Sequence, residues 1–308
     1  MKLKYGLIGA GGLGGYYGGK LAQAGADIHF LLRSDYQQVV NNGLRVDSVK
    51  GDFHLHPVSA YASAEDMPVC DVVLVCLKTT SNHLLPELLK PIVHDQTLVL
   101  LIQNGLGIED ELAQEMPGLN VAGGLAFICS QKVGPGHIQH LDLGRLILGM
   151  HSSKGEDVLK QVCQDFEQAG VPTTFSEDLV LSRWQKLVWN VPFNGLAVVL
   201  DASTNQMMGN ADAKELAQEL MLEVVHAANH CGCSLEEEFA AKMIATTMNM
   251  TPYAPSMKQD FDYQRPMEIE AIYAQPVKTA RAAGFEMKKT AMLERQLRFM
   301  EARQQAKK

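Results

Sequence analysis

The sequence has no apolar run long enough to cross a membrane, and it carries no excess of positive charge. A bilayer-spanning helix needs about 20 predominantly apolar residues, so we expect no membrane segment, and the first residues predict a strand rather than a signal peptide. The formal net charge of −8 argues against a nucleic-acid partner, which would require a basic face. The six cysteines are scattered, which indicates a reducing cytoplasm rather than a disulfide framework.

Common catalytic and metal-binding signatures are also missing. The chain contains neither a G-x-S-x-G nucleophile elbow nor a Walker phosphate loop. His226 and His230, followed by Cys231 and Cys233, have a spacing that suggests zinc, but Cys231-Gly232-Cys233 also has the pattern of a helix end capped by glycine. We therefore expect no metal. The composition, 46% hydrophobic and 20% charged, is typical of a globular protein.

The 308 residues are enough for two domains, and the hydrophobic pattern changes near residue 176. Before that point, apolar strand-like runs alternate with helical segments; strands are predicted over 5–8, 27–32, 44–49, 52–56, 71–77, 98–102 and 121–129, and helices over 16–24, 36–41, 83–93 and 109–115. After it, helices are predicted over 178–199, 211–230, 236–248, 257–283 and 288–305. We expect a Rossmann-type, doubly wound α/β domain in residues 1–175 and an all-helical domain in residues 176–308.

A glycine-rich turn between the first strand and the first helix is the strongest motif, and it comprises Gly9, Ala10, Gly11, Gly12, Leu13 and Gly14. The order of strand, turn, helix and second strand is that of a dinucleotide-binding βαβ unit. In such a unit Gly9 makes the turn, Gly11 lets the backbone approach a pyrophosphate, and Gly14 lets the helix pack closely on the strand. The start of the helix adds unpaired N–H groups. The motif predicts dinucleotide binding.

The residue after the second strand indicates which dinucleotide is bound. NAD enzymes usually place an acidic residue there, whereas this chain has Arg33 followed by Ser34. A guanidinium group suits a 2′-phosphate, so we predict NADP(H). The alternatives are a solvated surface arginine, and NAD held with the help of Asp35.

Two further polar residues follow central strands of the predicted sheet. Lys78 comes after 71–77, and Asn104 comes after 98–102. Ligands of open α/β sheets bind at the carboxyl ends of the strands, so these side chains are candidates for a phosphate and for a ribose, nicotinamide or substrate group. Each also has an ordinary explanation, as a solvated lysine and as an Asn-Gly turn.

A polar stripe runs along an otherwise apolar helix in the second half. Lys186, Asn190 and Asn194 are spaced i, i+4, i+8 and therefore share one face. Such a stripe is either the solvent face of the helix or the wall of a polar pocket, because it cannot lie in a dry core without partners. A lysine beside apolar walls has its charged form disfavoured, which suits a proton donor. Ser256 and Glu268 are weaker candidates; by spacing alone Glu268 is a helix glutamate.

Together these motifs resemble the ketopantoate reductase (2-dehydropantoate 2-reductase) family, nearly from end to end. The resemblance rests on the glycine turn, Arg33, Leu77-Lys78, Asn104-Gly105, the Lys-x3-Asn-x3-Asn helix, and Ser256-Met257-x-Gln259-Asp260 followed by Glu268. It implies NADPH-dependent reduction of a 2-oxo acid, in cytoplasmic pantothenate biosynthesis, with a small-molecule substrate as partner and a homodimer left open.

The resemblance also implies residue roles. Lys186 is the proton donor; substrate is bound by Asn104, Lys186, Asn190, Asn194, Ser256 and, if one residue has been inserted, Asn205. Glu268 lies by the cofactor and the active site. Three departures affect the substrate side: Pro255 replaces a serine, Gly195 replaces a proline, and Gln206 replaces a glycine. The 2-oxo acid therefore remains open.

The expected mechanism places the nicotinamide at the cleft between the domains. Hydride moves to the keto carbon while Lys186 protonates the alkoxide, and Glu268 orients Lys186, the ribose or a water. One alternative is a reductase of a different 2-oxo acid. The other is a non-catalytic NADPH-binding sensor, against which the complete set of lysine, asparagines, serine and glutamate argues.

Overall fold

A computed structural model describes residues 2–252 and 254–306 of the chain. Contacts divide the chain into two compact units. The first contains the chain up to Gln103 together with Ile108–Leu179, and the second contains Asn104–Gly107 and the chain from Val180 onward. Each unit has its own hydrophobic core.

One sheet organises the first unit, and its described strands number ten. The strands are β1 (Lys4–Ile8), β2 (Asp27–Leu31), β3 (Leu44–Ser48), β4 (Phe53–Leu55), β5 (Ala60–Tyr61), β6 (Val72–Val75), β7 (Leu98–Leu101), β8 (Asn120–Gly134), β9 (His137–Met150) and β10 (Thr173–Ser176). Their order is β4-β3-β9-β8-β7-β6-β1-β2-β5, with β10 beside β9. The central strands pair in parallel, whereas β8 and β9 form a long antiparallel ribbon. The residues of β6 and β7 are fully buried, as expected of parallel strands covered on both faces.

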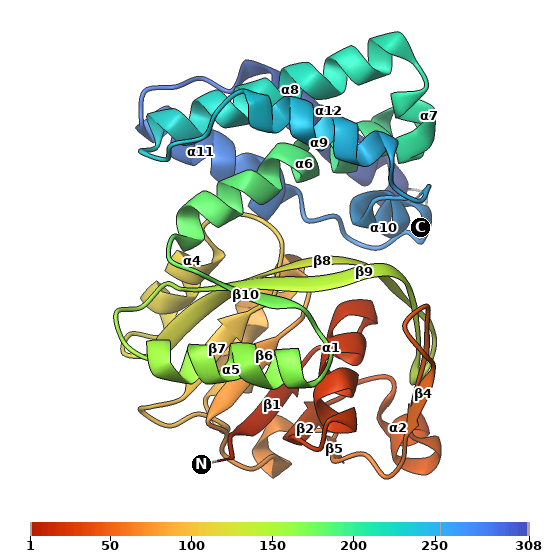
Figure 1. Ribbon diagram of the computed structural model, residues 1–308, viewed down its shortest axis with the longest axis vertical. Helices are drawn as coiled ribbons and strands as arrows, with labels where there is room; N and C mark the ends of the chain where they lie inside the picture. The colour runs from red at the N-terminus through yellow and green to blue at the C-terminus, as the bar shows by residue number, and fades with distance from the viewer. Residues whose placement is uncertain (1, 253, 307–308) are drawn as a thin grey trace. The chain divides into compact units, whose positions relative to one another are not determined.

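Helices cover this sheet, and they are α1 (Gly12–Gln23), α2 (Tyr36–Asn42), α3 (Leu85–Leu89), α4 (Ile108–Glu115) and α5 (Glu156–Gln168), with short 3₁₀ helices η1 (Ala64–Asp66) and η2 (Thr79–Leu84). Figure 1 shows α1 and α5 on the near side of the strands. The helix predicted over 83–93 is wrong in its bounds. Proline has no N–H to donate to the carbonyl group four residues earlier, so one α-helix cannot continue through Pro86. Pro86 instead lies in the first turn of α3, where no such bond is needed, and the segment before α3 is the 3₁₀ helix η2.

The second unit is helical throughout its regular structure, which comprises α6 (Leu179–Val199), α7 (Thr204–Met208), α8 (Ala211–His230), α9 (Glu238–Met248), α10 (Ser256–Asp262), the π-helix η3 (Glu270–Ala274), α11 (Gln275–Ala282) and α12 (Lys288–Gln305). The fold class predicted from the sequence, an α/β sheet followed by helices, is confirmed. The single helix predicted over 257–283 is wrong. Gln264 has a φ of 53°, in the left-handed region, and Pro266 cannot continue a helix, so α10 ends at Asp262.

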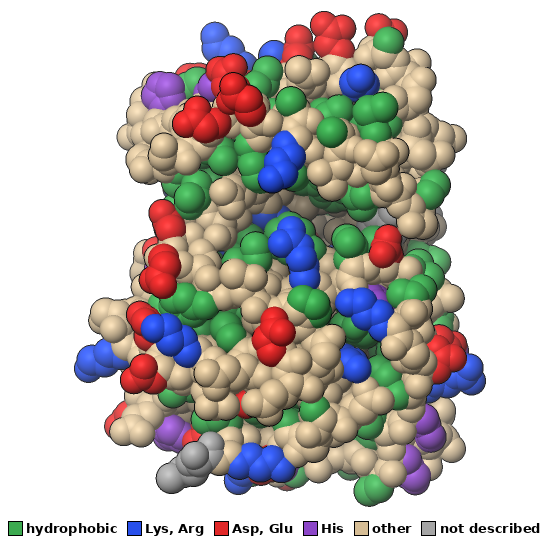
Figure 2. All heavy atoms as spheres, in the orientation of Figure 1, with side chains coloured by type: hydrophobic (Ala, Val, Ile, Leu, Met, Phe, Trp, Pro, Cys, Tyr) green, Lys and Arg blue, Asp and Glu red, His purple; other side chains and the backbone are tan. Residues whose placement is uncertain are grey.

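On the face shown in Figure 2, acidic and basic side chains are intermixed and form no broad basic patch. Among the described residues, no helix combines the length and the apolar character that a bilayer crossing requires. Within the same residues, no group of His, Cys, Asp and Glu side chains is arranged to hold a metal ion.

Candidate active site

The glycine turn after β1 has the geometry that a dinucleotide pyrophosphate needs. Gly9 has a φ of 96°, and a Cβ there would lie 2.7 Å from the nitrogen of Leu77. A Cβ at Gly14 would lie 2.1 Å from the carbonyl oxygen of Gly9, so helix and strand pack too closely for any side chain. At Gly11, by contrast, a Cβ would meet no heavy atom of the described chain within 4 Å. Space beside the backbone is therefore open at the position where a phosphate would approach.

The start of α1 is suited to an anion. Gly11 is the N-cap residue, and without a side chain it makes no side-chain capping bond to the first N–H groups. The first turn also contains no acidic residue. The N–H groups and the positive end of the helix dipole are therefore left for a ligand, and the turn fits a bound dinucleotide.

Arg33 and Asp35 lie close together after β2 but differ in their surroundings. Arg33 is exposed. Asp35 is only 6% exposed, and its carboxylate accepts hydrogen bonds from Lys132 Nζ at 2.7 Å and from the Gly136 nitrogen at 3.0 Å. Burial by itself would raise the pKa of Asp35, but these hydrogen bonds outweigh it and lower the pKa. The Asp35 carboxylate is thus occupied within the fold, and the alternative in which it binds a ribose loses its support.

The loop after β7 belongs to the helical unit, although the strand belongs to the first. Leu106 donates its N–H to the carbonyl oxygen of Ala271 at 3.0 Å, and a Cβ at Gly105 would lie 2.5 Å from the Cβ of Ala271. The loop that carries Asn104 therefore lies directly on η3, three residues along the chain from Glu268. Lys78, by contrast, is an exposed residue of the first unit, at the start of η2.

The polar stripe on α6 is not a solvent face. Asn190 is 5% exposed and Asn194 is 1% exposed, while Lys186 is half-buried. The side-chain nitrogen of Asn190 is buried and has no hydrogen-bond partner in the described part of the chain. Such a group is costly unless a ligand or water accepts from it. The interpretation of the stripe as a pocket wall is therefore favoured.

Asn194 connects α6 to the segment that carries Ser256. Its Oδ1 accepts hydrogen bonds from the nitrogen of Met257 at 3.0 Å and from Ser256 Oγ at 3.4 Å. The side chain thereby holds the first turn of α10 in place. The Asn194 and Ser256 side chains predicted from the sequence lie together in the structure.

Gly195 follows Asn194, and its surroundings leave no room for a side chain. Tyr273 donates its hydroxyl to the carbonyl oxygen of Val191 at 2.9 Å. A Cβ at Gly195 would lie 2.7 Å from that hydroxyl oxygen and 2.6 Å from a methyl carbon of Leu293. Glycine at this position therefore allows the tyrosine to reach the helix backbone.

Glu268 is 3% exposed and lies immediately before the helical turn that leads into η3. The prediction that it lies within a continuous helix is wrong. Two contacts hold the segment before it: Met267 donates its N–H to Glu301 Oε1 at 2.8 Å, and Arg265 Nε donates to Asp260 Oδ1 at 3.0 Å. π-Helical turns such as η3 are frequent at functional sites, and this one begins two residues after the buried Glu268.

Asn205 differs from the other predicted residues because it is exposed. It lies in the first turn of α7, and its Oδ1 accepts a hydrogen bond from Ser203 Oγ at 2.7 Å. Ser203 and Gln206 form a capping box there, which gives Gln206 a role in starting α7.

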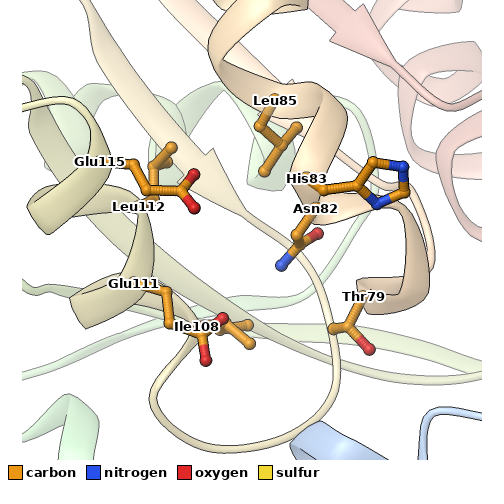
Figure 3. A pocket seen from close by; sticks show the side chains of 8 residues that line it. All are labelled: Thr79, Asn82, His83, Leu85, Ile108, Glu111, Leu112 and Glu115. Atoms are coloured by element: carbon orange, nitrogen blue, oxygen red, sulfur yellow. The ribbon is translucent and has the colours of Figure 1, made fainter.

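A cavity of ≈ 260 Å³ in the first unit was not predicted from the sequence. It lies between η2 and α4 and is lined by Thr79, Asn82, His83, Leu85, Ile108, Glu111, Leu112 and Glu115 (Figure 3). None of the predicted site residues lines it, although Lys78 immediately precedes its first residue. Its lining residues come from two segments that no sequence motif connects.

Comparisons with known proteins cover nearly the whole chain. A family described as ketopantoate reductase PanE/ApbA matches residues 5–153, and the C-terminal family of the same description matches residues 178–301. The chain is 47% identical over 305 residues to 2-dehydropantoate 2-reductase of Nostoc sp., covering 97% of this chain and 96% of the relative.

Solved structures agree with these matches. The crystal structure of 2-dehydropantoate 2-reductase from Geobacter metallireducens has a TM-score of 0.93 and 39% identity, covering 96% of this chain and 99% of its own. The enzyme of that name from Methylococcus capsulatus has a TM-score of 0.90 and 32% identity, covering 98% of each chain.

Proposed function

This chain belongs to the ketopantoate reductase family, and we propose that it reduces 2-dehydropantoate to pantoate with NADPH. The structural observation that carries the proposal is the buried polar stripe of α6. A helix that buries two asparagines beside a lysine, and leaves the amide nitrogen of Asn190 without a partner among the described residues, is suited to hold an oxygen-rich substrate.

We propose that the glycine turn and Arg33 hold the cofactor by its phosphates. The N–H groups at the start of α1 donate to the pyrophosphate, and the Arg33 guanidinium pairs with the 2′-phosphate. Lys78 adds positive charge at the same edge of the sheet, and Asn104 binds cofactor and substrate. Bound NADPH supplies the hydride that the 2-keto carbon accepts.

Substrate binding is assigned to the second unit. Asn190 donates its side-chain N–H to a substrate oxygen, and Ser256 contributes its hydroxyl. Because Asn194 Oδ1 already accepts from the first turn of α10, part of its effect on substrate is exerted by positioning Ser256. Asn205 is assigned no direct contact here, and its role stays a prediction.

Proton transfer is assigned to Lys186. Its Nζ donates a proton to the oxygen of the former keto group as negative charge develops there. Glu268 is close along the chain to the segment that Asn104's loop contacts, and we propose that it orients the lysine, the ribose or a water.

The proposed function is tested by removing the proposed proton donor, Lys186. We expect Lys186→Ala to lower the turnover number by about a thousandfold, as for removal of a general acid, with the Kd for NADPH changed less than about twofold. Turnover is followed by the loss of nicotinamide absorbance, and NADPH binding by fluorescence titration. Lys214→Ala on α8 is the matched control and should retain full turnover.

A panel of 2-oxo acids distinguishes the alternatives. Preference for 2-dehydropantoate supports the proposal; activity only on another acid keeps the chemistry and changes the substrate. Tight NADPH binding without turnover on any acid would favour the sensor. The homodimer, the absence of a nucleic-acid partner and the cytoplasmic location stay predictions.

A further inference from the structure

The turns after β1, β6 and β7 come together at the carboxyl edge of the central strands. The turn after β6 contains Leu77, and the other two turns contact its backbone. The glycine turn after β1 rests on it, because a Cβ at Gly9 would lie 2.7 Å from the Leu77 nitrogen and 2.8 Å from the Cys76 carbonyl carbon. The Leu77 carbonyl oxygen in turn accepts a hydrogen bond from Gln103, the last residue of the first unit before the loop that carries Asn104.

Gln103 joins the ends of β6 and β7 through one side chain. Its Nε2 donates to the Leu77 carbonyl oxygen at 2.8 Å and to Asn82 Oδ1 at 2.7 Å, and the residue is 4% exposed. The two hydrogens of the amide nitrogen are thereby directed to two acceptors on one segment. That segment, residues 77–82, includes Lys78.

The cavity behind η2 makes this attachment more important. Asn82 lines the cavity and is labelled among its side chains in Figure 3. Thr79 and Asn82 line the cavity of ≈ 260 Å³, so on that side the segment faces open space, and the hydrogen bond to Gln103 holds Asn82 from the sheet.

We propose that Gln103 is a positioning residue that holds residues 77–82 against the end of β7, so that the edge of the sheet is preformed for NADPH. This inference rests on the proposed function. Residue 103 must be a donor, because both atoms that face its nitrogen are acceptors. Fixing a binding segment in advance lowers the entropy cost of binding, so loss of Gln103 weakens cofactor affinity rather than the chemical step.

Thr97 provides a matched control at the opposite edge of the same two strands. It is fully buried at the amino end of β7, and its Oγ1 donates to the Cys70 carbonyl oxygen, just before β6, at 2.7 Å. Thr97→Val removes this hydrogen bond and the one that Thr97 Oγ1 accepts from the His94 nitrogen at 2.8 Å, far along the strands from the proposed cofactor edge, and it keeps the side-chain shape.

The experiment measures the Kd for NADPH, the Tm, and kcat and KM for the full chain carrying Gln103→Leu, Gln103→Glu or Thr97→Val. We expect both Gln103 variants to raise the Kd about tenfold, as for loss of one to two hydrogen bonds, with kcat at saturating NADPH within about twofold of wild type. Thr97→Val should lower the Tm without changing the Kd. If a Gln103 variant does not fold, Asn82→Ala removes one acceptor and should raise the Kd about threefold.

Two outcomes would overturn the inference in different ways. If the Gln103 variants raise the Kd no more than Thr97→Val does, or lower kcat with the Kd unchanged, Gln103 has no positioning role and the proposed function is unaffected. If the wild-type chain itself does not bind NADPH, the proposed function fails first.

Discussion

Arg33 and Asp35 show at the residue scale how two neighbouring charges acquire different uses. Asp35 is buried, hydrogen-bonded and ionised, whereas Arg33 is exposed at the end of β2. A residue engaged by Lys132 and Gly136 contributes to the fold, while an exposed guanidinium after the strand that pairs with β1 is open to solvent, as the proposed contact with the 2′-phosphate requires. The sequence identified both residues, but only the structure separates their roles.

Arg33→Ala tests the cofactor preference. We expect the KM for NADPH to rise about tenfold to a hundredfold, because a charge-assisted pair with the 2′-phosphate is lost, while the KM for NADH changes less than about twofold. Steady-state kinetics with both cofactors measure this difference. An equal rise for NADPH and NADH would assign Arg33 a role in the fold instead.

The lowered pKa of Asp35 predicts that part of the free energy of unfolding is lost in acid. Its pKa is lowered in the folded state, so the ionised form stabilises the fold above the unfolded pKa, about 3.9, and this contribution disappears as the pH falls through the lower folded value. Asp35→Asn should therefore lower the free energy of unfolding at neutral pH by about 1–3 kcal/mol and have a smaller effect at the lowest pH that permits measurement. Denaturant unfolding across this pH range provides the measurement, and a pH-independent difference would contradict the assignment.

At the scale of elements, helices and turns that a local residue pattern determines were predicted correctly from the sequence. The bounds of α8 and α12 coincide with their predicted ranges, and the glycine turn lies where its motif indicates. Helix α5 was missed although Leu159, Val162 and Phe166 carry a helical apolar spacing. Strand β10 has only four residues and gives no clear alternation.

Other elements depend on contacts that no local pattern reports. The loop Asn104–Gly107 belongs to the helical unit because Leu106 and Gly105 contact Ala271, far away in the sequence. The segment before Glu268 leaves the predicted helix and is held by Glu301 on α12. The family resemblance named Asn104 and Glu268, but their attachment to adjoining segments required the fold.

The contact between α12 and the Glu268 segment gives a prediction at this scale. Glu301→Ala removes the acceptor for the Met267 N–H, so we expect kcat/KM to fall about tenfold, consistent with a displaced site segment. Glu301→Gln keeps an acceptor oxygen and should restore kcat/KM to within about twofold of wild type. Arg295→Ala, at an exposed residue of the same helix, is the control; an equal loss there would indicate general destabilisation of α12.

At the scale of the whole molecule, the chain contains two hydrophobic cores that share no buried residue. The first is built on the sheet, and the second surrounds α6. Both tryptophans of the sequence, Trp184 and Trp189, lie in the second unit. Tryptophan fluorescence therefore reports the helical unit alone, whereas circular dichroism reports both. Two cores in one chain are the condition under which two-state unfolding fails.

A matched pair of substitutions tests whether the cores unfold separately. Val72 and Val224 are fully buried members of the two cores, the first in β6 and the second in α8. Either change to alanine should cost about 2 kcal/mol in its own unit by removing buried methyl groups. We expect Val224→Ala to shift the fluorescence transition, and Val72→Ala to leave it in place while shifting part of the circular dichroism transition. If each variant moved both signals equally, the two cores would form one cooperative unit, because a loss of packing in either core would then destabilise the whole chain.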